Sequence, residues 1–166
     1  MRSPKVAIME GSGNKHLRRL PSVFTDHPIY LITICTHKRA AYLANGSVVR
    51  VLVEEWRGAP KRHGWHVGRY VVMPDHVHFF CCPGLAEHRS LSQFVGAWKE
   101  WISKRLKREG INPVAAWQAE FFDHLIRSGE SYAEKWVYVR NNPVRAGLAE
   151  QSEEWLYQGV LERIEI

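Results

Sequence analysis

Apolar residues along this chain follow two periodicities, which predict a mixture of strands and helices. Runs rich in β-branched and aromatic residues predict four strands, at residues 28–36, 65–73, 76–82 and 121–126. Apolar positions three and four apart predict helices at residues 47–62 and 90–108. A third helix begins at Glu130 or Ser131, and Pro143 is expected to end it, because proline lacks the amide hydrogen that a helix interior needs.

The predicted order is strand, helix, strand, strand, helix, strand, followed by one additional helix. This is the order of the ferredoxin-like fold (βαββαβ), an α+β arrangement in which helices pack on one face of an antiparallel sheet. The other face of such a sheet is available for a ligand or for the additional C-terminal helix. We divide the chain into a flexible basic arm at residues 1–20, one domain at residues 21–150 and a C-terminal extension at residues 151–166.

The composition indicates a cytoplasmic protein with one core. Apolar residues make up 45% of the 166 positions, which suffices for one domain. No apolar run has the length of a membrane span, and residues 1–20 lack the apolar stretch of a secretory signal. Cys35, Cys81 and Cys82 have no CxxC spacing, so we expect buried thiols in a reducing compartment rather than disulfides or a zinc site.

The net charge favours a polyanion as partner. It is +6, and basic residues gather at residues 15–19, 57–63 and 104–108. Any single one of these clusters is better explained as a solvated helix face or tail. Seven tryptophans and six tyrosines add rings that can stack on unpaired bases, at about 1–3 kcal/mol each, although most of the tryptophans are expected in the core. Charge and aromatic content together indicate a nucleic acid as the partner.

Two histidines alternate in the predicted strand at residues 76–82. Side chains two positions apart in a strand project from the same face, so the imidazoles of His76 and His78 lie side by side. Such a pair can bind one divalent metal and leave coordination positions for a substrate. Paired histidines also occur as half-buried polar neighbours, and the pair alone does not decide between the two interpretations.

Tyr138 and Asn142 are four positions apart in the third predicted helix, so they are expected to share one face. If that helix lies near the two histidines, two imidazoles and one amide oxygen would leave about three positions of an octahedral ion free. Mg²⁺ or Mn²⁺ suits such a mixed set of ligands. A metal on the scissile phosphate would offset the weak nucleophilicity of a tyrosine hydroxyl, whose pKa is ordinarily about 10.

These motifs carry a resemblance to a known family. Residues 73–78 (MPDHVH) resemble the histidine–hydrophobic–histidine signature of the single-tyrosine HUH transposases. Residues 138–148 (YVRNNPVRAGL) resemble the tyrosine-helix signature of one branch, the REP-associated tyrosine transposases. Residues 117–118 and 121–128 are similar to the same branch, so the resemblance extends over nearly the whole domain.

The resemblance implies a transposase that cleaves single-stranded DNA next to a hairpin and rejoins it, through a 5′-phosphotyrosine. It implies that Tyr138 is the nucleophile and that His76, His78 and Asn142 bind Mg²⁺ or Mn²⁺, with Asn141 as a competitor for the third ligand. In REP-associated members the hairpins are repetitive extragenic palindromes of a bacterial chromosome, which implies association with the nucleoid.

Several assignments stay open at this stage. The candidate DNA contacts are basic residues of the arm and of the tyrosine helix: Lys15, Arg18, Arg19, Arg140 and Arg145. Tyr132 lies in the same helix on a different face and ranks below Tyr138. His124 is expected to be a structural residue or a DNA contact, and Asp123 is a candidate partner for a metal-bound histidine. A non-catalytic hairpin-binding protein derived from a transposase is the alternative function, and the chain can act as a monomer or a homodimer.

Overall fold

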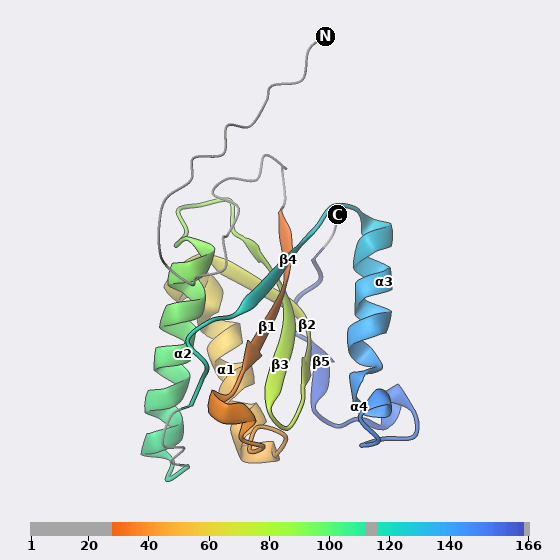
Figure 1. Cartoon of the computed structure of the whole chain (residues 1–166). Coiled ribbons are helices and arrows are strands. Elements are labelled where there is room, and N and C mark those ends of the chain that lie inside the picture. Colours follow the sequence, from red (N-terminus) through yellow and green to blue (C-terminus); the bar gives the residue numbers. More distant parts are fainter. Residues whose placement is uncertain (1–27, 112–115, 165–166) are drawn as a thin grey trace, which may run out of the picture.

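The computed structural model describes residues 28–111 and 116–164, and it has the α+β architecture expected from the sequence (Figure 1). One antiparallel sheet has the strand order β4-β1-β3-β2-β5. The strands are β1 (Ile29–Cys35), β2 (Trp65–Val72), β3 (His76–Pro83), β4 (Phe122–Ile126) and β5 (Gln158–Val160). The helices are α1 (Gly46–His63), α2 (Leu91–Arg108), α3 (Gly129–Arg140) and α4 (Asn142–Arg145), with 3-10 turns η1 (His37–Arg39) and η2 (Ser152–Glu154). The predicted ferredoxin-like core is confirmed in β1 to β4.

The fifth strand was not predicted. β5 runs alongside β2, with Val71 opposite Gln158 and Arg69 opposite Val160. The indole of Trp155 donates to the carbonyl of Val72 at 2.9 Å and holds the same segment against the sheet. Residues 158–160, within the segment beyond position 150, are therefore part of the sheet.

Helices α1 and α2 cover one face of the sheet and enclose the main core. Trp56 and Trp98 stack there with ring centroids 5.6 Å apart and planes at 8°, and both pack on Phe79. Ser90 begins α2 with a capping box, as the sequence predicts, because its hydroxyl accepts from the amide of Gln93. This face has the character of an ordinary close-packed protein interior.

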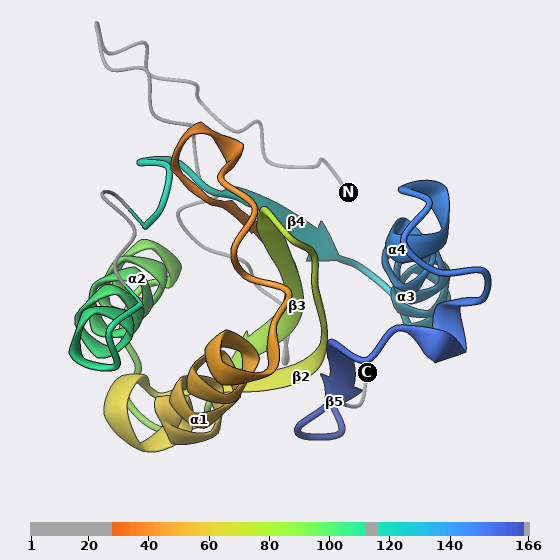
Figure 2. The same ribbon diagram turned by 90° about the horizontal axis from the view of Figure 1, so that it is seen from below.

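Helix α3 lies on the opposite face, so it is the additional helix that the fold leaves room for (Figure 2). Its Tyr132 and Trp136 rings pack on Phe80 of β3, at centroid distances of 4.6 Å and 6.4 Å. Phe80 is two residues from His78 in the same strand, so α3 covers the face from which the histidines project.

The end of the third helix differs from the prediction. Helix α3 ends at Arg140, and Pro143 lies in the first turn of α4 instead of terminating the helical segment. Proline is tolerated there because the first amides of a helix have no partner within it. Within the described ranges, no helix is long and apolar enough to cross a membrane.

Candidate metal and nucleophile site

The two histidines lie side by side on the α3 face of the sheet. The rings of His76 and His78 have centroids 4.8 Å apart and planes at 85°. His78 lies directly across from Thr33 of β1 and Val71 of β2, and His76 lies across from Cys35. The strand alternation expected from the sequence is therefore present in the fold.

Each imidazole is held through its Nδ1 atom. His76 Nδ1 lies 2.7 Å from a carboxylate oxygen of Asp75, and His78 Nδ1 lies 2.7 Å from the hydroxyl of Thr33. A carboxylate can only accept, so Nδ1 of His76 carries the hydrogen and Nε2 keeps its lone pair. In the described part of the chain, Nε2 of neither ring is hydrogen-bonded. The Thr33 hydroxyl can accept a hydrogen bond from Nδ1 of His78, and in that tautomer Nε2 of His78 also keeps its lone pair. Two neighbouring imidazoles held in this way suit a divalent metal.

The environment keeps both imidazoles neutral. Burial lowers the pKa of His78 to about 3, and the positive charges of His76, Arg145 and Arg39 act in the same direction. Burial also lowers the pKa of His76, against the opposing effect of its hydrogen bond to Asp75 and of the negative charge of that carboxylate. Because a histidine must be neutral to bind a metal, neither side chain would have to lose a proton at neutral pH. The side chains of His76 and His78 are therefore suited to bind a divalent metal ion.

An arginine completes the support of His76. Arg39 Nε lies 2.8 Å from the second carboxylate oxygen of Asp75. Burial would raise the pKa of Asp75, but the hydrogen bond and charge of His76 and the charge of Arg39 bring it below its usual value. Arg39 and its neighbour Lys38 both have positive φ angles, 57° and 52°. A left-handed backbone at two non-glycine residues costs about 1–3 kcal/mol each, and such strain is concentrated at functional sites.

Sequence reasoning missed these supporting residues. Asp123 was the candidate partner, but it lies opposite Ile32, whose side chain belongs to the α1–α2 core. Asp123 is therefore on the wrong face of the sheet for that role. The signals for the observed partners were present in the chain: Asp75 directly precedes the first histidine, and Thr33 is a polar residue inside an apolar strand.

Tyr138, Arg145 and Asn142 form a second group, at the junction of α3 and α4. The guanidinium carbon of Arg145 lies 4.1 Å from the centroid of the Tyr138 ring. Arg145 also donates a hydrogen bond to the amide oxygen of Asn142. Tyr138 is 62% exposed, so its hydroxyl is open to a large substrate. Tyr138 and Asn142 do not belong to one continuous helix, because α3 ends at Arg140 and Asn142 begins α4. Arg145 contacts both side chains.

Arg145 also connects the group of Tyr138 and Asn142 to the histidine pair, through an electrostatic effect on His78. Its charge is one of the causes that lower the pKa of His78. Figure 1 shows α4 at the same end of the sheet as the turn between β2 and β3, where His76 lies. Tyr138 and Asn142 make no recorded contact with either histidine. Among the residues that the structure describes, no three His, Cys, Asp or Glu side chains converge on a metal site.

The other predicted site residues lie elsewhere. Arg140 donates to the hydroxyl of Ser152 at 3.0 Å and forms an ion pair with Glu153, which fastens α3 to η2. Its predicted DNA contact stays a prediction. Tyr132 is half-buried between Phe80 and Arg69, and burial raises its pKa. The three predicted DNA contacts of the arm, Lys15, Arg18 and Arg19, lie outside the described residues.

Two of the basic clusters belong to the helices, and some of their cations form ion pairs with carboxylates. Arg105 contacts Glu54, Glu55 and Glu109, and Arg62 contacts Glu55 at 2.6 Å. These cations therefore neutralise carboxylates of the same fold. The positive charge available to a polyanion is correspondingly smaller on α1 and α2 than the sequence count suggests.

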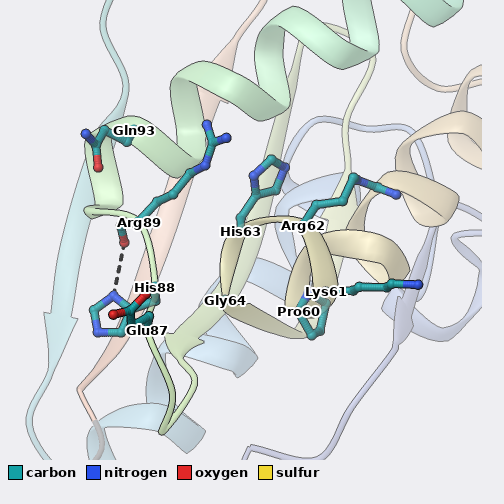
Figure 3. Close-up of a pocket in the computed structure, with 9 residues that line it drawn as sticks. All are labelled: Pro60, Lys61, Arg62, His63, Gly64, Glu87, His88, Arg89 and Gln93. Atoms are coloured by element: carbon teal, nitrogen blue, oxygen red, sulfur yellow. Dashed lines mark hydrogen bonds between the residues drawn. The ribbon is translucent and has the colours of Figure 1, made fainter.

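A polar cavity of about 380 Å³ lies between the end of α1 and the start of α2 (Figure 3). His63, Arg89 and Gln93 are among the residues that line it. The hydrogen bond from the amide of Gly84 to the carbonyl of Gly64 lies beside it, next to the Pro83 end of β3. His76 lies at the opposite end of β3. None of the predicted site residues lines this cavity.

Comparison with known proteins identifies the family. The family model described as "Transposase IS200 like" matches residues 25–142, so this chain belongs to the IS200-like transposase family. The "REP-associated tyrosine transposase" of Escherichia coli (strain K12) is 29% identical over 91 residues, which are 55% of this chain and 52% of that protein. The "Putative REP-associated tyrosine transposase" of Haemophilus influenzae (strain ATCC 51907 / DSM 11121 / KW20 / Rd) is 26% identical over 147 residues, covering 81% of this chain and 80% of that protein. The chain thus spans about half the length of the first relative.

A solved structure supports the fold. The structure of a REP-associated tyrosine transposase bound to a REP hairpin superposes with a TM-score of 0.70 at 18% identity. The match covers 86% of this chain and 82% of that protein. The predicted family resemblance is confirmed by these relatives, and the predicted fold class by this structure.

Proposed function

We propose that this protein is a REP-associated tyrosine transposase that cleaves and rejoins single-stranded DNA next to a chromosomal hairpin. The observation that carries the proposal is the histidine pair, with both Nδ1 atoms occupied and both Nε2 atoms uncommitted. An exposed tyrosine beside an arginine, at the same end of the sheet, supports it. The relatives named above support the hairpin as the substrate.

In this proposal His76, His78 and Asn142 hold Mg²⁺ or Mn²⁺. When bound, the ion supplies a Lewis acid that stabilises negative charge on the phosphoryl oxygens. Asn142 would have to exchange its hydrogen bond with Arg145 for the metal. The guanidinium released by that exchange would remain beside Tyr138, where it can neutralise a phosphate oxygen.

The chemical step is an attack by the Tyr138 hydroxyl oxygen on the scissile phosphorus. The new bond joins the tyrosine oxygen to the 5′ phosphate, the bond from phosphorus to the 3′ oxygen breaks, and the released strand ends in a 3′ hydroxyl. The tyrosine proton passes to solvent, to which this side chain is open. Rejoining reverses the step with a 3′ hydroxyl as nucleophile, so no nucleotide cofactor is consumed.

A strand-cleavage assay tests this proposal. The probe is an end-labelled REP-type hairpin oligonucleotide with single-stranded flanks, mixed with Mn²⁺ or with EDTA. We expect Mn²⁺-dependent cleavage by the wild type and none by Tyr138→Phe, because only the nucleophilic oxygen is removed. Tyr132→Phe is the matched control in the same helix and should cleave normally.

Binding of the same probe separates the two candidate functions. An enzyme should retain hairpin affinity in Tyr138→Phe while losing cleavage. Tight binding by the wild type without cleavage, across several hairpins, would establish the non-catalytic binder instead. Cleavage that survives Tyr138→Phe would contradict the assignment of the nucleophile.

A further inference from the structure

Strand β4 carries an exposed aromatic ring in the same row as the histidine pair. Phe122 lies across from Thr33 of β1, and Thr33 lies across from His78 of β3. Residues directly opposite each other in antiparallel strands project from the same face, with Cβ atoms about 5 Å apart. Phe122, Thr33 and His78 therefore form one row, with the Cβ atoms of Phe122 and His78 about 10 Å apart.

The ring is open although it lies on a face that packs a helix. Phe122 is 53% exposed, whereas Phe80, two strands away on the same face, is fully buried under Tyr132 and Trp136. β4 is the edge strand of the sheet. Helix α3 thus covers Phe80 and leaves Phe122 uncovered. Single exposed apolar side chains are common on protein surfaces, so exposure alone does not single out Phe122. Its place in the same row as the histidine pair does.

The surroundings suit an unpaired nucleotide. His124 is exposed two residues further along the same face, about 6.8 Å away. A guanidinium nitrogen of Arg39 lies 3.5 Å from Nδ1 of His76, so a cation borders the histidine end of the row. An isolated ring among hydroxyl, imidazole and guanidinium groups is too small and too polar for a protein interface. Aromatic rings next to cations are how proteins bind single-stranded nucleic acid.

We infer that Phe122 is a stacking platform for one unpaired base of the DNA strand, within about three nucleotides of the scissile phosphate. The inference rests on the proposed function, because it takes the position of that phosphate from the histidine pair. About 10 Å of sheet corresponds to at most about three stacked nucleotide steps of 3.4 Å. His124 contacts the sugar or phosphate of the adjoining nucleotide.

A cycle of paired changes in protein and DNA tests the inference. The probe is the flanked hairpin oligonucleotide, with one base at a time replaced by an abasic site. Phe122→Leu should weaken binding of the intact probe at least about fivefold, and Phe122→Tyr should preserve it, since tyrosine keeps the ring. At one flank position, removing the base should weaken wild-type binding equally and should not weaken Phe122→Leu any further. Leu85→Ala, at an exposed apolar residue beyond the far end of β3, is the control and should bind normally.

A purely structural role for Phe122 predicts a different result. Phe122→Leu would then lose the same affinity with every abasic probe, and that outcome overturns the inference. Cleavage by the wild type, measured on the same probes, separates this question from the proposed function. Cleavage without a coupled position would refute the stacking platform alone, whereas a coupled position without cleavage would refute the enzyme and leave the platform standing.

Discussion

The two faces of the sheet use their side chains in different ways. Under α1 and α2 the rings of Trp56 and Trp98 stack at 5.6 Å, and Arg105 is surrounded by carboxylates of the neighbouring helix. On the α3 face, His76 and His78 are fixed through one nitrogen and leave the other uncommitted. The side chains of the first face stabilise the fold. The second face leaves hydrogen-bonding groups and one aromatic ring accessible, as is typical of a functional site.

The largest expected effect is a difference in stability between tryptophan variants on the two faces of the sheet. Trp98→Ala should lower the free energy of unfolding by about 3–5 kcal/mol, because it leaves a cavity in a fully buried stack. Trp136→Ala, on the half-buried α3 face, should cost only about 1–2 kcal/mol. Urea denaturation of both variants measures the difference. Equal losses would contradict the assignment of the main core to the α1–α2 face.

Thr33→Val should weaken metal binding without weakening the fold. Valine suits a central strand, but it cannot hydrogen-bond Nδ1 of His78, so the ring loses its fixed orientation. Loss of such a supporting partner typically lowers metal affinity by about 10–100-fold. Titration calorimetry with Mn²⁺ measures this, and Thr33→Ser, which keeps the hydroxyl, is the control. Unchanged affinity in Thr33→Val would mean that His78 is not a ligand.

His63→Gln should reduce the loss of stability in acid. Burial lowers the pKa of His63, and the charges of Arg89 and Arg62 lower it further. The unfolded chain therefore takes up the proton more readily, so the free energy of unfolding falls as pH drops below about 6.5. Removing the His63 imidazole should make the free energy of unfolding decrease less steeply between about pH 7 and pH 5. An unchanged slope in His63→Gln would refute the explanation.

The smallest effect concerns the backbone that positions Arg39. Lys38→Gly should raise the free energy of unfolding by up to about 1 kcal/mol, since glycine adopts a φ of 52° without the steric cost. Lys38→Ala keeps that cost and is the control. Differential scanning calorimetry of both variants shows whether glycine alone gains stability. A loss with Lys38→Gly would mean that no strain is stored in this turn.

The fold was predictable where periodicity is strong. The four core strands and the helices α1 and α2 follow apolar patterns long enough to identify, and Ser90 marks the start of α2. β5 escaped prediction because three residues, one of them a glycine, carry no periodicity. The break after Arg140 escaped because a proline marks either the end of one helix or the first turn of the next.

The site was predictable only in part, for a similar reason. Alternation along one strand sufficed to pair His76 with His78. The partners that fix these rings depend on register: Thr33 faces His78 only because β1 and β3 pair with that alignment. The link through Arg145 likewise depends on how α4 folds back toward Tyr138. No single-sequence pattern encodes either relation.

The most direct test of the central claim is to locate the covalent bond between protein and DNA. Protein treated with the flanked hairpin and Mn²⁺ would be digested, and the nucleotide-bearing peptide identified by tandem mass spectrometry. We predict one phosphotyrosine, at Tyr138, that is absent with EDTA and absent from His76→Ala. A linkage at Tyr132 or at any other residue, or cleavage that leaves no covalent linkage, would contradict the account.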